Sequence, residues 1–210
     1  AAIAERENKK FSEYLGMIMV CTGTGCVSTG GFTIKELFDK ALAKHGLDKE
    51  WIAVATGCNG FCAVGPIAVI QPQVIFYQKL TEKDVDEIVE SHLLNGKVVE
   101  RLLHTDPVTG AKNEKMTDIG FFSKQQLIAL RNKGLIDPEN IDHYIARGGY
   151  AALKTVLTEN DQEKVIMEVV SSGLRGRGGG GFPAGIKWKS GRKAAIDRSE
   201  EIFIVCNADE

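Results

Sequence analysis

Short apolar runs that end in turn-forming residues predict buried strands in the first hundred positions. The run over residues 14–20 ends in a Gly/Thr cluster, and residues 51–55 form a second such run. Two more, at 67–70 and 74–77, are separated only by Gln-Pro-Gln, which is typical of a tight connection. Runs of this length between turn-forming residues predict four strands.

Two amphipathic stretches lie among these strands and predict helices. The first has apolar residues at i, i+3, i+4, i+7 and i+8, the spacing of one helix face: Ile34, Leu37, Phe38, Ala41 and Leu42. We expect Thr33 to cap this helix, Glu36 to complete a capping box, and Gly46 to end it. Thr81 is expected to open the second helix, and Gly96 to end it. The pattern predicts β-α-β-β-β-α, or β-α-β-α with a hairpin, which is an α/β unit of thioredoxin-like size.

The second half of the chain predicts a linker, then helices and a glycine-rich segment. Residues 104–117 are polar and rich in turn formers, so we expect an interdomain linker there. We expect one helix to open at Ser123, with Gln126 as its capping partner, and another over 161–171. A strand is expected over 201–206. We predict an N-terminal α/β domain over residues 1–103 and the linker over 104–117. Residues 118–210 are predicted to form the helical start of a second, incomplete α/β domain.

Composition and charge limit the classes of protein to which this chain can belong. The 210 residues are 43% hydrophobic and 26% charged, as in an ordinary soluble globular protein. The net charge of −2 argues against a nucleic-acid binder, which carries a basic surplus. The longest early apolar run, over residues 14–20, is far shorter than the roughly 20 residues of a membrane span. No export signal is visible, so we expect a cytoplasmic protein. Structural disulfides are rare in the cytoplasm, and the five cysteines therefore need another explanation.

Four of the cysteines stand in two pairs at metal-ligand spacing. Cys21 and Cys26 form C-x4-C, and Cys58 and Cys62 form C-x3-C. Each pair follows a predicted strand, and loops at one end of neighbouring strands can bring four thiolates together around a metal or cluster. Glycines in these loops let the backbone wrap tightly and point its N–H groups at sulfur: Gly23, Gly25, Gly57 and Gly60. A zinc site, disulfides, unligated core thiols and an iron–sulfur cluster all remain open at this point.

The order C-x4-C, a helix, a strand and C-x3-C on an α/β scaffold resembles the thioredoxin-like [2Fe–2S] ferredoxin family. The resemblance covers residues 14–100. It implies that the four paired cysteines are the ligands of one [2Fe–2S] cluster: Cys21, Cys26, Cys58 and Cys62. Such a cluster carries one electron, so this domain is expected to relay electrons.

Residues 176–181, Gly-Arg-Gly-Gly-Gly-Gly, match G-x-G-x-x-G outside the usual context of a dinucleotide fold. That fold needs a strand before the glycines, whereas residues 161–171 have helical periodicity. No Gly-Lys-Ser/Thr follows, which excludes a P-loop. A flexible glycine linker remains an alternative. Charged, aromatic and proline residues surround the glycines, however, and a simple spacer does not need them: Arg175, Arg177, Phe182, Pro183, Lys187 and Trp188.

The successive glycines of residues 176–181 predict a backbone segment that binds an anion and a flat ring. Their N–H groups form a nest that binds phosphate, and the missing Cβ atoms let a ring approach the backbone. Arg177 and Lys187 add positive charge, and Phe182 offers a face for stacking. The expected strand over 201–206 brings three polar residues to its carboxyl end, where ligands of open α/β sheets bind: Asn207, Asp209 and Glu210.

The run 172–188, with Cys-Asn-Ala-Asp-Glu at 206–210, resembles the flavoprotein family that includes the FMN- and NADH-binding subunit of respiratory complex I. The resemblance covers residues 118–210. It implies FMN contacts at matching positions: Gly176, Arg177, Gly178, Gly180, Lys187, Asn207 and Asp209. It implies contacts with the nicotinamide nucleotide at Phe182 and Glu210. Gly180 departs from the Ala that is frequent in this family.

The fusion of a ferredoxin domain with a flavoprotein domain resembles the flavoprotein subunits of soluble, often electron-bifurcating, NAD(P)-linked [FeFe]-hydrogenases and related formate dehydrogenases. It implies an oxidoreductase subunit that passes electrons between NAD(P)H, FMN and iron–sulfur clusters. The implied partners are a catalytic hydrogenase or dehydrogenase subunit, a small thioredoxin-like [2Fe–2S] subunit, and ferredoxin.

Two alternative functions remain: a [2Fe–2S] relay without catalysis of its own, and a zinc-stabilised interaction domain. Members of the flavoprotein family continue well past Asn-Ala-Asp-Glu. We therefore expect this chain to be a fragment of a longer subunit, inactive by itself.

Overall fold

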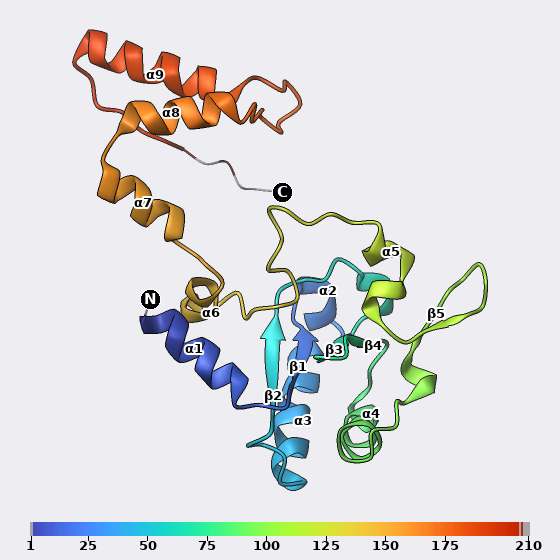
Figure 1. Cartoon of the computed structure of the whole chain (residues 1–210). Helices are drawn as coiled ribbons and strands as arrows, with labels where there is room; N and C mark the ends of the chain where they lie inside the picture. The colour runs from blue at the N-terminus through green and yellow to red at the C-terminus, as the bar shows by residue number, and fades with distance from the viewer. Residues whose placement is uncertain (1, 206, 208–210) are drawn as a thin grey trace. The chain divides into compact units, whose positions relative to one another are not determined.

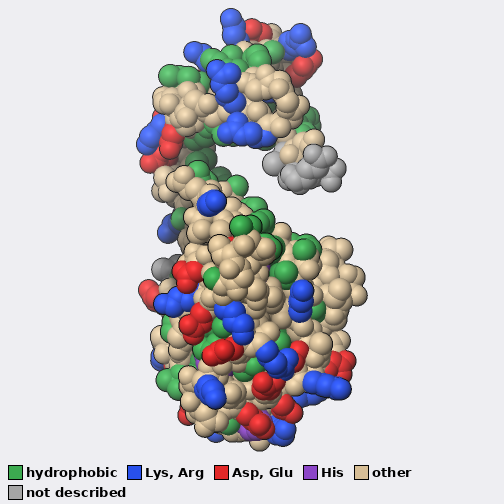
Figure 2. All heavy atoms as spheres, turned by 90° about the vertical axis from the view of Figure 1, so that its right-hand side faces the viewer, with side chains coloured by type: hydrophobic (Ala, Val, Ile, Leu, Met, Phe, Trp, Pro, Cys, Tyr) green, Lys and Arg blue, Asp and Glu red, His purple; other side chains and the backbone are tan. Residues whose placement is uncertain are grey.

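The computed structural model describes residues 2–205 and 207. The chain divides into two compact units, Ala1–Gly149 and Tyr150–Glu210 (Figure 1). No helix in the described residues is long and apolar enough to cross a membrane. On the face drawn in Figure 2, Lys and Arg side chains are interspersed with Asp and Glu.

The first unit is built on a four-stranded mixed sheet. Its strands are β1 (Gly16–Cys21), β2 (Trp51–Thr56), β3 (Ala68–Gln71) and β4 (Ile75–Tyr77), in the spatial order β2-β1-β3-β4. β1 and β2 are parallel, and β3 is antiparallel to both β1 and β4 (Figure 1). All four predicted strands are confirmed.

Helices cover one face of this sheet. They are α3 (Gly31–Lys44), α4 (Glu82–Glu87) and η2 (Ile88–Leu94), which continues α4 as a π-helix. The core on this face combines side chains from the sheet and the helices: Ile18, Val20, Phe38, Ile70, Tyr77, Val85 and Ile88. The order β1-α3-β2-β3-β4-α4 confirms the first of the two predicted topologies.

The opposite face of the sheet is also buried. Met19, Val69 and Phe76 point into a second cluster, which Ile119 closes from later in the chain. Because both faces of the central strands are covered, their sequences are continuous apolar runs and do not alternate.

The predicted capping box of α3 is wrong. The helix begins at Gly31, and its N-cap is Gly30 with φ +97°, so Thr33 lies within the first turn. The first residue of the helix is glycine because a Cβ at Gly31 would lie 2.8 Å from the Cys21 carbonyl oxygen and 3.0 Å from that of Cys26. Tertiary contact with the cysteine loop therefore decides where the helix begins.

The other predicted helix ends are confirmed. Gly46 follows α3 with φ +69°, and Gly96 follows η2 with φ +64°. Thr81 caps α4, where it forms a capping box with Asp84.

Residues 104–117, predicted as a linker, are folded onto the sheet. They contain a two-stranded hairpin: β5 (His104–Thr105) and β6 (Lys112–Asn113). The Phe76 N–H donates to the Glu114 carbonyl, and the Met116 N–H donates to the Val74 carbonyl, each at 3.0 Å. The polar residues of this segment therefore form a turn in a structured extension of β4, inside the first compact unit. The domain boundaries stay a prediction.

The helix predicted to open at Ser123 is wrong. α5 (Gly120–Ser123) ends at that residue, and residues 124–140 form turns and irregular structure. The prediction rested on Leu127, Ile128 and Leu130, and these apolar side chains are exposed, with Ile128 at 76%. A short amphipathic pattern forms a helix only where its apolar face is buried.

The remaining elements of the first unit are short, apart from the N-terminal helix α1 (Ala2–Ser12), which packs on α6 (Ile141–Ala146). In that contact the buried Glu7 carboxylate lies 3.9 Å from His143 Nε2. The short elements are α2 (Thr24–Val27), η1 (Cys62–Val64), η3 (Glu100–Leu102) and η4 (Met116–Asp118).

The described part of the second unit contains the helices α7 (Ala151–Glu159), α8 (Gln162–Ser171) and α9 (Ala184–Arg198). α8 is the helix predicted before the glycines, and Asp161 caps it. Residues 201–205 have no regular secondary structure, so the strand predicted over 201–206 is wrong for those five residues, and Cys206 lies outside the described residues. A strand needs a neighbour to pair with, and the described residues of this unit form no sheet.

Candidate functional site

The two cysteine pairs lie at the same end of the sheet, where the parallel strands β1 and β2 finish. Cys21 is the last residue of β1 and is paired in register with Thr56, the last residue of β2. The loops that follow are tied together, because both the N–H and the hydroxyl of Thr22 donate to the Thr56 carbonyl, at 2.9 and 2.8 Å. The strand order therefore delivers Cys58, two residues after β2, beside the loop that follows Cys21.

Glycines let the loops that carry the cysteines touch. A Cβ on Gly23 would lie 2.5 Å from Cys58 Cβ, and a Cβ on Gly25 would lie 3.1 Å from Cys62 Sγ. Gly65 was not predicted, but a Cβ there would lie 2.8 Å from Cys26 Sγ. Each of these positions is in contact with a cysteine of the other loop, which brings all four sulfurs into one region.

The predicted glycines differ in what they do. Gly23 and Gly25 permit the close approach of the loops. Gly60 has φ +77°, and its N–H donates to Cys58 Sγ at 3.2 Å, as predicted for an amide that stabilises a sulfur. Gly57 is not needed for space, because a Cβ there would meet only Pro138, at 3.8 Å.

The cysteines interact electrostatically as two pairs. The hydrogen bond from the Cys26 thiol lowers the pKa of Cys21 to about 5, against the opposing effect of burial, and the same hydrogen bond raises the pKa of Cys26. The charge of Cys58 raises the pKa of Cys62. Cys21 and Cys26 thus share a proton, and that proton must leave before both thiolates bind metal.

This donor set fits a [2Fe–2S] cluster, which is held by four cysteine thiolates. The four cysteines form no disulfide in the described chain; Cys21 and Cys26 are buried, whereas Cys58 and Cys62 are exposed. No group of three or more His, Cys, Asp or Glu side chains in the described residues is arranged to hold a metal ion. The four cysteines are therefore arranged as two pairs, one from each loop, and the two members of each pair interact.

Comparison with known proteins agrees with this geometry. The profile of the thioredoxin-like [2Fe-2S] ferredoxin family matches residues 10–93. A 2Fe-2S ferredoxin of Clostridium pasteurianum is 44% identical over 77 residues, which make up 37% of this chain and 76% of that protein. The chain belongs to the thioredoxin-like [2Fe–2S] ferredoxin family. Membership supports a [2Fe–2S] cluster as a cofactor of this ferredoxin domain.

Longer relatives share the ferredoxin domain. The NADP-reducing hydrogenase subunit HndC of Solidesulfovibrio fructosivorans is 54% identical over 87 residues, and a subunit of the NADH-quinone oxidoreductase of Rhizobium meliloti is 42% identical over 83 residues. The matches cover 41% and 40% of this chain but only 17% and 19% of those proteins.

The predicted glycine loop lies in the second unit between α8 and α9. The Gly176 N–H donates to the Phe182 carbonyl at 2.9 Å, and the guanidinium of Arg175 donates to the Gly181 carbonyl at 3.2 Å, so the loop is closed at its base. A helix precedes the glycines, which confirms that the context is not that of a dinucleotide fold. Lys187 lies in the first turn of α9, next to the loop.

The loop presents its predicted contact residues to solvent. Gly176, Arg177, Gly178 and Gly180 are exposed, as is Phe182 at 57%. Asn207 is described but lies outside any helix or strand, and Asp209 and Glu210 lie outside the described residues. The roles of these residues in FMN and nucleotide binding stay a prediction.

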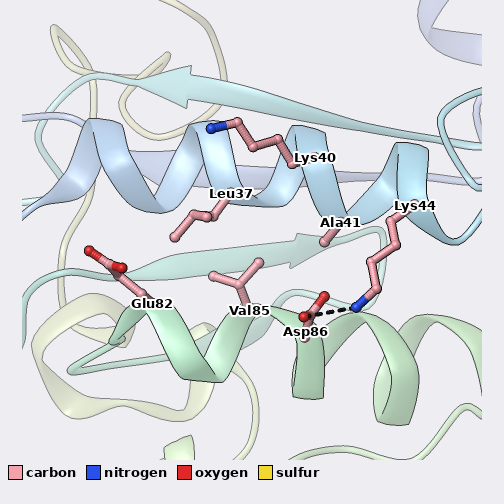
Figure 3. A pocket seen from close by; sticks show the side chains of 7 residues that line it. All are labelled: Leu37, Lys40, Ala41, Lys44, Glu82, Val85 and Asp86. Atoms are coloured by element: carbon pink, nitrogen blue, oxygen red, sulfur yellow. Dashed lines mark hydrogen bonds and ion pairs between the residues drawn. The ribbon is translucent and has the colours of Figure 1, made fainter.

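A hollow lies on the first unit away from the cysteines, between α3 and α4. Figure 3 shows Leu37, Ala41 and Val85 between the two helices, and charged side chains complete the lining: Lys40, Lys44, Glu82 and Asp86. One side is closed by the ion pair between Lys44 and Asp86, at 3.0 Å. The exposed ion pair contributes little to stability, and nothing in the lining suggests catalysis.

Proposed function

We propose that this chain is part of the electron-transfer flavoprotein subunit of a multisubunit NAD(P)-linked oxidoreductase of the hydrogenase type. The observation that carries the proposal is the meeting of four free cysteines at the ends of β1 and β2. Cys21, Cys26, Cys58 and Cys62 are proposed as the ligands of a [2Fe–2S] cluster. The bound cluster supplies one-electron transfer.

The cysteine loops give this site an inner and an outer side. Cys21 and Cys26 are 1% and 2% exposed, whereas Cys58 and Cys62 lie on the surface. Burial of the first pair fixes its position, and exposure of the second pair leaves an edge for a redox partner. We propose that a second iron–sulfur subunit, a catalytic subunit or a ferredoxin docks at this edge.

The second unit is proposed to hold FMN and NAD(P)H. The exposed glycines between Gly176 and Gly181 offer backbone N–H groups to a phosphate, and Arg177 and Lys187 add positive charge. The names of the longer relatives, a hydrogenase subunit and an NADH-quinone oxidoreductase subunit, support this assignment. Electron bifurcation and a cytoplasmic location remain part of the proposal.

The cluster is tested by anaerobic reconstitution of the 210-residue chain with iron and sulfide. We expect absorption between 400 and 600 nm, and a rhombic paramagnetic resonance signal after reduction. Cys58→Ser should abolish or alter this signal. Cys206→Ser is the matched control, because Cys206 belongs to neither pair, and it should leave the signal unchanged. A colourless protein that binds one zinc ion would contradict the proposal.

The flavin assignment is tested separately by titration with FMN, using quenching of flavin fluorescence. Lys187→Ala should weaken binding, because Lys187 stands beside the glycine loop. Lys193→Ala removes the same charge from the same helix further from the loop, and it should not weaken binding. If cluster formation is normal but neither FMN nor NADH binds, the second candidate is favoured, a relay without catalysis. The presence of all four cysteines within the first unit already points to such a relay as the alternative.

A further inference from the structure

The arginines of the chain differ in whether they have a carboxylate partner. In the described residues, ion pairs with Asp or Glu are formed by Arg6, Arg101, Arg192 and Arg198. The other arginines form none within the described chain, and they lie in two places. Arg175 and Arg177 lie at the glycine loop, where they bond to backbone carbonyls. Arg131 and Arg147 line a hollow on the first unit, which the proposed function does not use.

This arginine hollow has a volume of about 380 Å³. Its lining consists of Asn8, Arg131, Asn132, Ala146 and Arg147. These residues come from α1, from the irregular segment 124–140, and from the end of α6. Among the described residues that line it, none is acidic and only the alanine is apolar. The volume lies in the range of small-molecule sites, about 300–1,000 Å³.

Contacts between these segments hold the hollow in shape. α1 packs on α6, where the Glu7 carboxylate lies 3.9 Å from His143 Nε2. The irregular segment is joined to α6 by the Asp137 N–H, which donates to His143 Nδ1 at 3.2 Å. His143 is therefore in contact with both neighbouring segments. The side chains of the hollow thus stand on elements that are already packed together before a ligand binds.

Asn132 orients the guanidinium of Arg147. The Arg147 Nε–H donates to Asn132 Oδ1 at 3.0 Å, and the two terminal amino groups of the guanidinium have no partner in the described chain. The side chain of Arg131 makes no hydrogen bond to the described residues. A guanidinium presents its donors in a planar fork that matches the oxygens of a phosphate. The side-chain amides of Asn8 and Asn132 can add uncharged donors.

This donor set favours a phosphate over other ligands. Two guanidinium groups with no carboxylate in the lining favour a ligand that carries two negative charges. A phosphate monoester carries a charge of about −1.5 to −2 at pH 7 and has three strong acceptor oxygens. A flavin ring or a nucleobase, in contrast, needs an apolar or aromatic surface to pack on, and the lining offers only Ala146. The hollow therefore suits the phosphate end of a small molecule.

We propose that Arg131 and Arg147, assisted by Asn8 and Asn132, form a binding site for the phosphate groups of a small ligand, either a pyrophosphate or a phosphate monoester. The ligand is held by its oxygens and not by a ring. This inference goes beyond the proposed function, because neither the four cysteines nor the glycine loop takes part in it. It holds whether or not the chain binds a [2Fe–2S] cluster.

The test is a calorimetric titration of the 210-residue chain with pyrophosphate and with glycerol phosphate at low ionic strength. We expect saturable binding of at least one of them. Arg131→Gln and Arg147→Gln should each weaken it about tenfold, because each removes charge-assisted hydrogen bonds. Arg147→Lys keeps the charge without the planar fork, and its affinity should lie in between. Arg198→Gln is the matched control: it removes an exposed arginine from the end of α9, and it should leave the affinity unchanged.

The glycine loop is also proposed to bind a phosphate, so the occupied site is identified by nuclear magnetic resonance. The side-chain Nε–H signals of the arginines are followed during the titration. Those of Arg131 and Arg147 are assigned by their loss in the two glutamine variants. We expect both signals to shift over the range of ligand concentration in which heat is released.

The outcomes distinguish the arginine hollow from the glycine loop. If only the signals of Arg175 and Arg177 shift, and Arg131→Gln and Arg147→Gln bind as the wild type does, the inference is wrong and the proposed flavin site is untouched. It is also wrong if neither phosphate binds, or if Arg198→Gln weakens binding as much as the hollow variants. Equal affinity for succinate would contradict the assignment to phosphate. Should Arg147→Gln fail to fold, as judged by circular dichroism, Arg131→Gln decides.

Discussion

Replacing Gly23 by alanine should prevent stable cluster binding. Gly23 has φ −66° and ψ 157°, a conformation that alanine adopts without strain, so the added methyl group is the whole perturbation. This methyl carbon would lie 2.5 Å from Cys58 Cβ and 3.0 Å from its Sγ. Ordinary van der Waals contact begins at 3.4 Å, and Cys58 would have to retreat by about 0.9 Å.

A displacement of this size exceeds what a metal site tolerates. Ligand distances in such sites lie within about 0.2 Å of their ideal values, so Cys58 would move out of bonding range. We expect the half-life of the cluster in the presence of an iron chelator to fall at least about tenfold, a change of the size that follows loss of a supporting contact at a metal site. The measurement is the decay of visible absorption under anaerobic conditions.

Two neighbouring glycines make the experiment quantitative. Gly25→Ala brings a methyl group to 3.1 Å from Cys62, where a shift of a few tenths of an ångström suffices, and it should have an intermediate effect. Gly57→Ala adjoins Cys58 but meets only Pro138 at 3.8 Å, and it should behave as wild type. Cluster lifetimes that are equal in all three variants, or shortest in Gly57→Ala, would refute the argument from loop contact.

Three further predictions concern the two folded units. Tyr77→Phe removes a buried hydroxyl that accepts a hydrogen bond from the Val99 N–H at 3.1 Å and is hydrogen-bonded to His92 Nδ1 at 2.9 Å. The substitution should lower the free energy of unfolding, measured with urea, by about 2 kcal/mol. Burial lowers the pKa of His92 below 6.5, so the stability that this group contributes is complete above pH 6.5 and is lost as the pH falls through the folded-state pKa. Unfolding free energies at pH 7.5 and about pH 5 should therefore differ more in the wild type than in His92→Gln. Gly185→Ala places a methyl group 2.5 Å from the α8 backbone and should lower the melting temperature of the second unit. Gly191→Ala on the same helix is the control, because its methyl group meets nothing within 4 Å in the described chain, and it should leave the melting temperature unchanged.

The sequence by itself determined the elements whose signals are local. Apolar runs between turn formers predicted the four strands and their order along the chain, and the spacing of the cysteines distinguished two pairs. Helical periodicity before the glycines argued against the context of a dinucleotide fold, and α8 confirms that a helix precedes them. Each of these features depends on residues a few positions apart, so a short window of sequence contains its cause.

The tertiary structure decided the features that depend on distant contacts. Residues 104–117 look like a linker in sequence, but they form a folded extension because β4 offers an edge to pair with. The pattern that opens at Ser123 is helix-like in sequence, but residues 124–140 form no helix, and its apolar side chains stay exposed: Leu127, Ile128 and Leu130. Asn59 has no distinguishing signal in the sequence, and only the fold buries its side chain, against Gly134, 75 positions later. Pairing, burial and desolvation are set by neighbours in space, and a one-dimensional pattern does not contain them.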